Sequence, residues 1–212
     1  MLELYTWTTP NGRKVSILLE ELEIPYECHP VDLNKGEQRG PDFRALSAFG
    51  RIPLLRDSDT GQTISESGAI MIWLAEREGR FLGAPGDKGN VLEWLMWQMS
   101  AQGPVLGRIH QFAHYGRRIG VVAETQLREQ GAAVYATLDQ RLTDRDFVAG
   151  AGRGSYSIAD MAIWPWVSRF EWHEIDLNAY PAVREWYLRL AERPAVQRGY
   201  HLPHFVNDVP IP

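Results

Sequence analysis

Residues 2–33 read LELYTWTTPNGRKVSILLEELEIPYECHPVDL, which indicates a strand, a helix and a second strand in succession. Residues 2–7 mix apolar with β-favouring side chains, as short strands do. Apolar residues then recur at spacings of three and four from Val15 to Leu22, which predicts an amphipathic helix with Asn11 as a candidate N-cap. Residues 26–33 predict the second strand. Strands joined through a helix favour a parallel pair with a right-handed crossover.

Two more strands and a second helix are predicted before residue 80. The polar stretch 34–46 contains loop residues and room for one short helix. IPLLR (52–56) predicts a buried third strand, and DSDTGQ (57–62) predicts a turn. TIS (63–65) predicts a fourth strand, close enough to the third for an antiparallel hairpin, and helical spacing follows in 67–77. The predicted order is therefore β-α-β-(α)-β-β-α.

The composition changes at EGRFLGAPGDKG (78–89), whose glycines and charges are typical of a linker. Beyond it no strand pattern is evident. Helical spacing recurs in four segments, which are 90–112, 120–143, 157–172 and 181–193. The tail 201–212 contains three prolines and predicts extended chain. The expected fold class is an α/β N-terminal domain with a mixed four-stranded sheet, followed by an all-α C-terminal domain.

Composition and charge exclude several kinds of function. The 212 residues are 44% hydrophobic and 23% charged, which is typical of a globular protein. The net charge of −5 argues against nucleic acid as a partner. Apolar runs such as AIMIWLA are too short to cross a bilayer, and no basic leader of a secretory signal is seen, so no membrane association is expected. The single cysteine, Cys28, rules out an intrachain disulfide and favours a reducing compartment, the cytoplasm.

Two dipeptides in the first domain have both a structural and a functional interpretation. Ile52-Pro53 could open a strand through a trans bond, or hold a cis bond that turns the Ile52 backbone toward an extended peptide. Glu66-Ser67 could simply begin a helix. Alternatively, Ser67 and the helix N-terminus would bind a carboxylate, and Glu66 would bind the neighbouring ammonium group of an amino acid.

The turn TTPNG (8–12) lies where a strand enters a helix, a common place for thiol chemistry, yet it has no cysteine, serine or tyrosine. Asn11 could cap the helix or face a ligand, and Thr9 could be a turn residue. Cys28 is predicted in mid-strand, where no helix N-terminus or basic cluster would lower its pKa. We therefore reject a Cys–His nucleophile.

No metal site is predicted. His110 and His114 are four residues apart on an expected helix, but HQFAH contains no carboxylate and no third ligand is evident.

Ser157 and Asp160 form an S-x-x-D pattern before the apolar run AIWPWV. This spacing predicts a capping box, in which Ser157 caps the helix and Asp160 bonds back to the cap. We interpret the motif as structural.

The order of these features resembles the cytosolic glutathione S-transferase family over nearly the whole chain. TPNGRKV, KGEQ, GRIP, ESGAI and SIADMAIWPWV are similar to segments of the bacterial Nu class in particular. The resemblance implies a thioredoxin-like glutathione-binding domain (1–79), a linker (80–88), an all-helical domain (89–200) and an extended tail (201–212). It also implies a homodimer.

The same resemblance assigns roles to residues of the first domain, with glutathione as a substrate and without a metal. Thr9 and Asn11 would lie near the glutathione sulfur and lower its pKa by donating hydrogen bonds, so the ligand's own sulfur would be the nucleophile. The remaining contacts would hold the cysteinyl, γ-glutamyl and glycyl parts of the tripeptide. They are assigned to Gln38, Arg51, Ile52, Pro53 (in cis), Glu66 and Ser67.

For the second substrate the family resemblance implies an apolar pocket that collects residues from both halves of the chain. The candidates are Trp7, His110, Phe112, Tyr115 and Trp172. Nu-class proteins usually have an arginine near residue 126; here Gln126 stands there and Arg128 is the nearest arginine that could reach a partner subunit. Phe49, in SAFGRIP, is either a dimer contact inserted into the partner or a locally packed loop residue.

The expected activity is glutathione-dependent reduction of a small disulfide without a catalytic cysteine. Two alternatives stay open. The same activated thiolate could conjugate glutathione to electrophiles, or serve peroxidase or etherase chemistry. A weakly catalytic protein that binds glutathione for regulation is the third interpretation.

Overall fold

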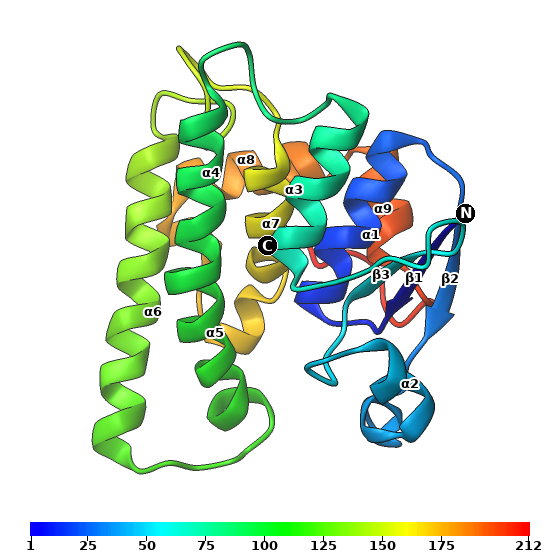
Figure 1. Ribbon diagram of the computed structural model, residues 1–212. Coiled ribbons are helices and arrows are strands. Elements are labelled where there is room, and N and C mark those ends of the chain that lie inside the picture. The colour runs from blue at the N-terminus through cyan, green and yellow to red at the C-terminus, as the bar shows by residue number, and fades with distance from the viewer. The chain divides into compact units, whose positions relative to one another are not determined.

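The computed structural model describes residues 1–212 as two compact units (Figure 1). The first unit comprises residues 1–80 and 192–209, and the second comprises 81–191 and 210–212. Sequence analysis assigns 192–200 to the helical domain and 201–212 to a separate tail, whereas the structure groups 192–209 with the first unit.

The first unit is built on the mixed four-stranded sheet that the pattern predicts. Its strands are β1 (Leu2–Thr6), β2 (Tyr26–Pro30), β3 (Leu54–Asp57) and β4 (Thr63–Ser65). The order across the sheet is β2-β1-β3-β4, with β1 and β2 parallel and the other pairs antiparallel. The fourth strand has the predicted bounds, whereas the first three are shorter than predicted, and β3 begins after Pro53 rather than at Ile52.

The helices of the first unit are α1 (Pro10–Leu22), α2 (Pro41–Leu46), α3 (Ser67–Glu78) and α9 (Pro194–Tyr200), with a 3₁₀ turn η1 (Glu37–Arg39). The apolar side of α1 is buried, as its spacing predicts.

Helix α9 belongs to this unit because it packs closely against α1. A Cβ added at Gly199 would stand 2.6 Å from the Cα of Ile17, so only glycine permits this approach. The Ser16 hydroxyl donates to the Gly199 carbonyl over 2.7 Å, and Arg13 Nε donates to the Tyr200 carbonyl over 2.9 Å. These contacts hold the two backbones together.

The second unit contains helices and no strand, as predicted. Its α-helices are α4 (Lys88–Trp97), α5 (Gly103–Ile109), α6 (Val121–Leu142), α7 (Ile158–Val167) and α8 (Pro181–Ala191). Short π and 3₁₀ turns lie between them, namely η2 (Gln98–Gln102), η3 (His110–His114), η4 (Phe170–His173) and η5 (Leu177–Ala179). No helix combines the length and the apolar character that a bilayer span needs.

The capping box at the start of α7 is confirmed, and its carboxylate also accepts hydrogen bonds from two other segments. Ser157 Oγ accepts from the Ala159 N–H, and Asp160 accepts from the Ser157 N–H over 3.1 Å. The same buried carboxylate accepts from the Val148 N–H and the Trp186 indole, each over 3.0 Å. Asp160 therefore ties a loop and α8 to the first turn of α7.

Candidate functional site

Thr9, rather than Asn11, caps the first helix. Its side-chain oxygen accepts from the Gly12 N–H over 3.1 Å, Pro10 is the first helical residue, and Asn11 lies within the first turn. Gly12 has no alternative here, because a Cβ would collide with the Trp7 carbonyl and the Thr6 hydroxyl. The interpretation of Asn11 as the N-cap is wrong. Asn11 is the second residue of α1, and its side-chain amide does not cap the helix.

The peptide bond between Ile52 and Pro53 is cis, so of the two conformations considered for this dipeptide the cis form is confirmed. Ile52 lies before β3 and outside the strand pairs of the sheet. Its side chain packs on the small core formed by Val31, Phe43 and Leu54. Ile52 also borders a cavity, which is described below.

The start of α3 joins a strained residue to a buried hydroxyl. Glu66 has φ 70° and ψ 117°, a conformation that non-glycine residues seldom adopt. Ser67 is the first residue of α3 and is buried. No side chain caps this helix, and its first turn has no acidic residue. Glu66 is the residue before the first turn, but its side chain makes no capping hydrogen bond, so the partial positive charge of the helix N-terminus faces the region around Ser67.

The predicted catalytic and glutathione-binding residues line two adjoining cavities of the first unit. One, of about 380 Å³, is bounded by Thr9, Asn11, Leu33, Gln38, Arg39, Gly50, Arg51 and Ile52. The other, of about 70 Å³, is bounded by Asn11, Phe49, Arg51, Ile52, Pro53, Ser65, Glu66 and Ser67. Three side chains border both, so the cavities form one elongated site at the start of α1. Every residue predicted for catalysis or glutathione binding lies on it.

Gln38 offers an acceptor at this site. Its side-chain oxygen is buried and has no hydrogen-bond partner within the chain. A buried carbonyl without a donor is unfavourable, and an amide N–H of a bound peptide would satisfy it.

The candidates for a second-substrate pocket divide between the units. Trp7 lies in the first unit, where its ring meets His204 edge-on. In the second unit, the rings of His110 and Tyr115 lie 5.2 and 6.0 Å from that of Trp172. Phe112 is buried, with the Arg128 guanidinium over its ring at 4.8 Å. Three of the five candidates thus share one aromatic cluster.

His110 ends a buried hydrogen-bonded chain that the sequence did not reveal. Its Nε2 lies 2.7 Å from Nε2 of His173, and His173 Nδ1 lies 2.8 Å from the Tyr135 hydroxyl. Burial, and next the charge of Arg169, lower the pKa of His110 to about 3, so its ring is neutral at physiological pH. The residues are far apart in sequence, so no local pattern predicts their meeting.

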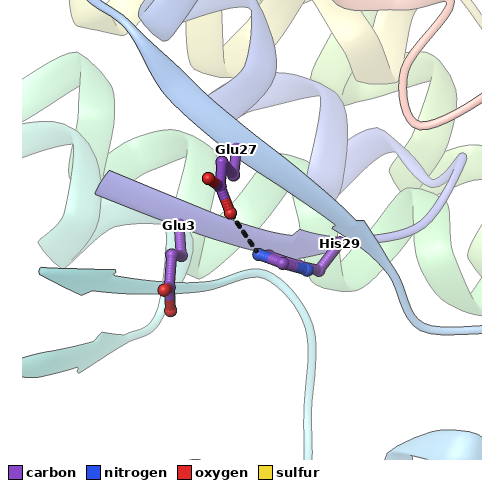
Figure 2. Close-up of side chains that lie close together, drawn as sticks. All are labelled: Glu3, Glu27 and His29. Carbon is purple, nitrogen blue, oxygen red and sulfur yellow. Dashed lines mark ion pairs between the residues drawn. The ribbon is translucent and has the colours of Figure 1, made fainter. Parts of the chain in front are cut away.

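One group of potential metal ligands comes together on the sheet. Glu3, Glu27 and His29 lie on the neighbouring strands β1 and β2, with ligand atoms within 4.8 Å of one another (Figure 2). The His29 ring lies 3.6 Å from the Glu27 carboxylate, and Glu3 already pairs with Arg56 at 3.4 Å. The guanidinium of Arg56 offsets the negative charge that would attract a cation. These side chains belong to neither of the two cavities.

Cys28 lies in β2 as predicted. Burial, and next the charge of Glu20, raise the pKa of its thiol to about 11. A thiol of that pKa is almost entirely protonated at neutral pH, which agrees with rejecting it as a nucleophile.

Comparison with known proteins identifies both halves of the chain. The models of the glutathione S-transferase N-terminal domain and C-terminal domain match residues 8–77 and 121–189. Disulfide-bond oxidoreductase YfcG of Escherichia coli is 39% identical, with 92% of each chain covered. Disulfide-bond oxidoreductase YghU of the same organism is 34% identical over 93% of this chain and 73% of the relative.

Solved structures agree with these matches. A glutathione transferase from Pseudomonas putida, with one glutathione disulfide bound per subunit, has a TM-score of 0.88 and 35% identity. The match covers 95% of this chain and 91% of the other. A family member from Pseudomonas fluorescens, with two glutathione molecules bound, has a TM-score of 0.86 and 31% identity over 95% and 93% of the two chains. This chain therefore belongs to the glutathione S-transferase family.

Proposed function

We propose that this protein is a glutathione-dependent enzyme that reduces small disulfides by activating the thiol of glutathione. The observation that carries the proposal is the lining of the two cavities, where Thr9 and Asn11 stand at the start of a helix and no cysteine is present. The names of the relatives YfcG and YghU, and the glutathione disulfide in the Pseudomonas putida structure, support disulfide chemistry. A reducing compartment such as the cytoplasm suits this chemistry.

The donors at the start of α1 suit a thiolate. The Thr9 oxygen accepts from the Gly12 N–H with one lone pair, so its hydroxyl proton can be donated to the sulfur. The Asn11 amide adds a second donor, and the N-terminus of α1 adds partial positive charge. All three would stabilise the thiolate of glutathione and so lower its thiol pKa from the ordinary value of about 8.5. Neither side chain is itself a nucleophile.

Binding would place the rest of the tripeptide along the two cavities. The Ile52 backbone would pair with the cysteinyl residue beside cis Pro53. Glu66 and Ser67 would hold the γ-glutamyl ammonium and carboxylate groups, and Gln38 and Arg51 would reach the glycyl end.

The reaction follows from thiol–disulfide exchange. The glutathione thiolate attacks one sulfur of the substrate disulfide, forming a mixed disulfide and releasing the other half as a thiolate, which takes up a proton. A second glutathione thiolate then attacks the glutathione sulfur of the mixed disulfide. This forms glutathione disulfide and releases the second substrate thiol. Two glutathione molecules are oxidised for each disulfide reduced.

The wild-type protein is expected to reduce a model mixed disulfide, such as that of glutathione and 2-mercaptoethanol, faster than it conjugates glutathione to an aryl halide. The physical reason is that the donors at α1 stabilise a thiolate, and attack of a thiolate on a disulfide sulfur needs no further activation. Displacement of a halide ion from an aryl ring also builds negative charge on the ring. Both rates are measured with the same enzyme and glutathione concentration. Strong conjugation without disulfide turnover would favour the transferase alternative. Tight binding of glutathione in calorimetry without turnover of either substrate would favour a binding protein.

We also propose that the protein forms a homodimer through Phe49. This side chain is 59% exposed, which argues against the alternative of local loop packing. Arg128, the other dimer candidate, pairs with Glu174 over 2.6 Å within its own chain. A large exposed aromatic residue is the kind that anchors protein interfaces.

Replacing Phe49 by alanine is expected to weaken dimerisation at least tenfold, because one buried aromatic anchor often contributes 2 kcal/mol or more, roughly a thirtyfold effect. Sedimentation equilibrium of the wild type and the variant measures this directly. Phe205→Ala is the matched control, because Phe205 is 61% exposed in the C-terminal segment of the same unit. A dimer of undiminished strength in Phe49→Ala would refute the role of Phe49.

A further inference from the structure

A buried lysine lies beside the candidate glutathione site, and the sequence motifs assign it no role. Lys14 is 1% exposed and lies on α1, three residues after Asn11. Residues three apart share a face of a helix, so Lys14 continues the face that presents Asn11. Its Nζ donates to Ser67 Oγ over 3.4 Å. The lysine thus connects the helix of the thiol donors to the start of α3.

A buried ammonium group is unfavourable unless something offsets its lost hydration. Burial lowers the pKa of Lys14 to about 7, and the charge of Glu66 acts in the opposite direction. An apolar residue at this position would avoid the cost. Packing alone therefore does not explain a lysine at this buried position. Binding of an anion in the neighbouring cavity, which Ser67 borders, would explain it.

The hydrogen bond from Lys14 fixes the orientation of the Ser67 hydroxyl group. When Lys14 is charged, its ammonium group can only donate, so Ser67 Oγ accepts from it and the serine hydroxyl keeps its proton for another acceptor. Ser67 borders the smaller cavity, together with Glu66 and Asn11. A donor polarised by a cation, at a helix N-terminus with no side-chain cap, is suited to bind a carboxylate.

We propose that Lys14 is a positioning residue that acts through the Ser67 hydroxyl and makes the site select peptides carrying the α-carboxylate of a γ-glutamyl group. This inference rests on the proposed function, which places that carboxylate at Ser67. Lys14 does not touch the peptide. It orients Ser67 and adds positive charge close to the bound carboxylate.

The test compares two ligands in isothermal titration calorimetry. One is glutathione, and the other is 4-aminobutyryl-cysteinyl-glycine, which lacks only the α-carboxylate. Lys14→Met is expected to weaken glutathione binding at least tenfold and to change binding of the analogue less than twofold. Ser67→Ala should show the same carboxylate-specific loss. Lys88→Met is the matched control, because Lys88 is an exposed lysine of the other unit and its loss should affect neither ligand.

The stability of the ligand-free variant separates positioning from a structural role. Removal of a buried charge should leave the urea midpoint of Lys14→Met unchanged or raise it. A lowered midpoint, or a variant that does not fold, would contradict the inference. Equal losses for both ligands would also overturn it, while leaving the proposed function intact. Failure of the wild type to bind glutathione would instead overturn the proposed function and this inference together.

Discussion

Replacing Thr9 by valine is expected to lower kcat/KM for disulfide reduction at neutral pH about tenfold for each unit by which the thiol pKa rises, because the thiolate fraction falls by that factor. Valine keeps the shape of threonine but has no hydroxyl. The thiolate of glutathione would therefore lose the hydrogen bond proposed for Thr9. In the pH profile of kcat/KM, the apparent thiol pKa should move upward, toward the ordinary value near 8.5. Steady-state kinetics from pH 6 to pH 9 measure both changes.

Two further variants separate the donor from the cap. Thr9→Val also removes the acceptor of the Gly12 N–H, which should cost about 1 kcal/mol of the free energy of unfolding. Thr9→Ser keeps both functions, and its kcat/KM should stay within about threefold of the wild type. Asn11→Ala leaves the Thr9 cap in place, so any loss of activity would report the amide alone. Wild-type activity in Thr9→Val would show that Thr9 only caps α1.

Patterns of local origin predicted the secondary structure well. The period of the apolar residues located α1, and the short apolar runs located four strands. The directions of the first and last strand pairs were predicted, whereas the pairing of β1 with β3 was not. The S-x-x-D spacing located the capping box of α7. These features depend on residues within one turn or one strand, so the sequence carries their full signal.

Features that depend on contacts between distant segments were not predictable. The assignment of α9 to the first unit rests on the close approach of Gly199 to Ile17, and a glycine in a helical stretch does not reveal what packs on it. The sequence offers Asn11 as a candidate N-cap and Thr9 only as a turn residue, whereas Thr9 is the N-cap. The reason here is different. Both residue types cap well, and Pro10 at the first helical position was the signal that favoured Thr9.

Sequence motifs predicted the residues that line the candidate site, but they did not predict the role of Lys14 behind Ser67. Asn11, Ile52 and Ser67 are recognised by their neighbours in sequence, and the structure brings them to one pair of cavities. Lys14 looks like a surface residue of an amphipathic helix until the fold buries it beside Ser67. One weak signal existed, because Lys14 is three residues after Asn11 and one before the apolar Val15.

Replacing Asp160 by alanine is expected to lower the free energy of unfolding by about 4 kcal/mol, a large part of the stability of an ordinary domain. The Val148 and Ser157 N–H groups and the Trp186 indole all donate to this carboxylate. Each buried donor left without an acceptor costs roughly 1–3 kcal/mol, partly recovered if water enters the vacated space. Urea unfolding followed by tryptophan fluorescence measures the loss.

The pH dependence of that loss distinguishes the carboxylate from the space it fills. Burial raises the pKa of Asp160 from 3.8 to about 6, against the lowering effect of its four hydrogen bonds. A carboxyl whose pKa is higher in the folded than in the unfolded state contributes most below the unfolded pKa, and this contribution is lost as pH rises through about 6. The difference between the wild type and Asp160→Ala should therefore be larger at pH 5 than at pH 7.5.

Matched variants show how much of the stability lost in Asp160→Ala comes from the contacts of Asp160 with Val148 and Trp186. Ser157→Ala removes the side-chain cap but leaves the Asp160 contacts to Val148 and Trp186, so it should cost only about 1 kcal/mol. Asp144→Ala removes an exposed carboxylate of the same unit and should change stability by less than about 0.5 kcal/mol. A loss in Asp160→Ala no greater than that of Ser157→Ala would mean that Asp160 serves α7 alone. A larger loss would show that the capping carboxylate also holds the loop and α8 in place, which a motif of four residues cannot indicate.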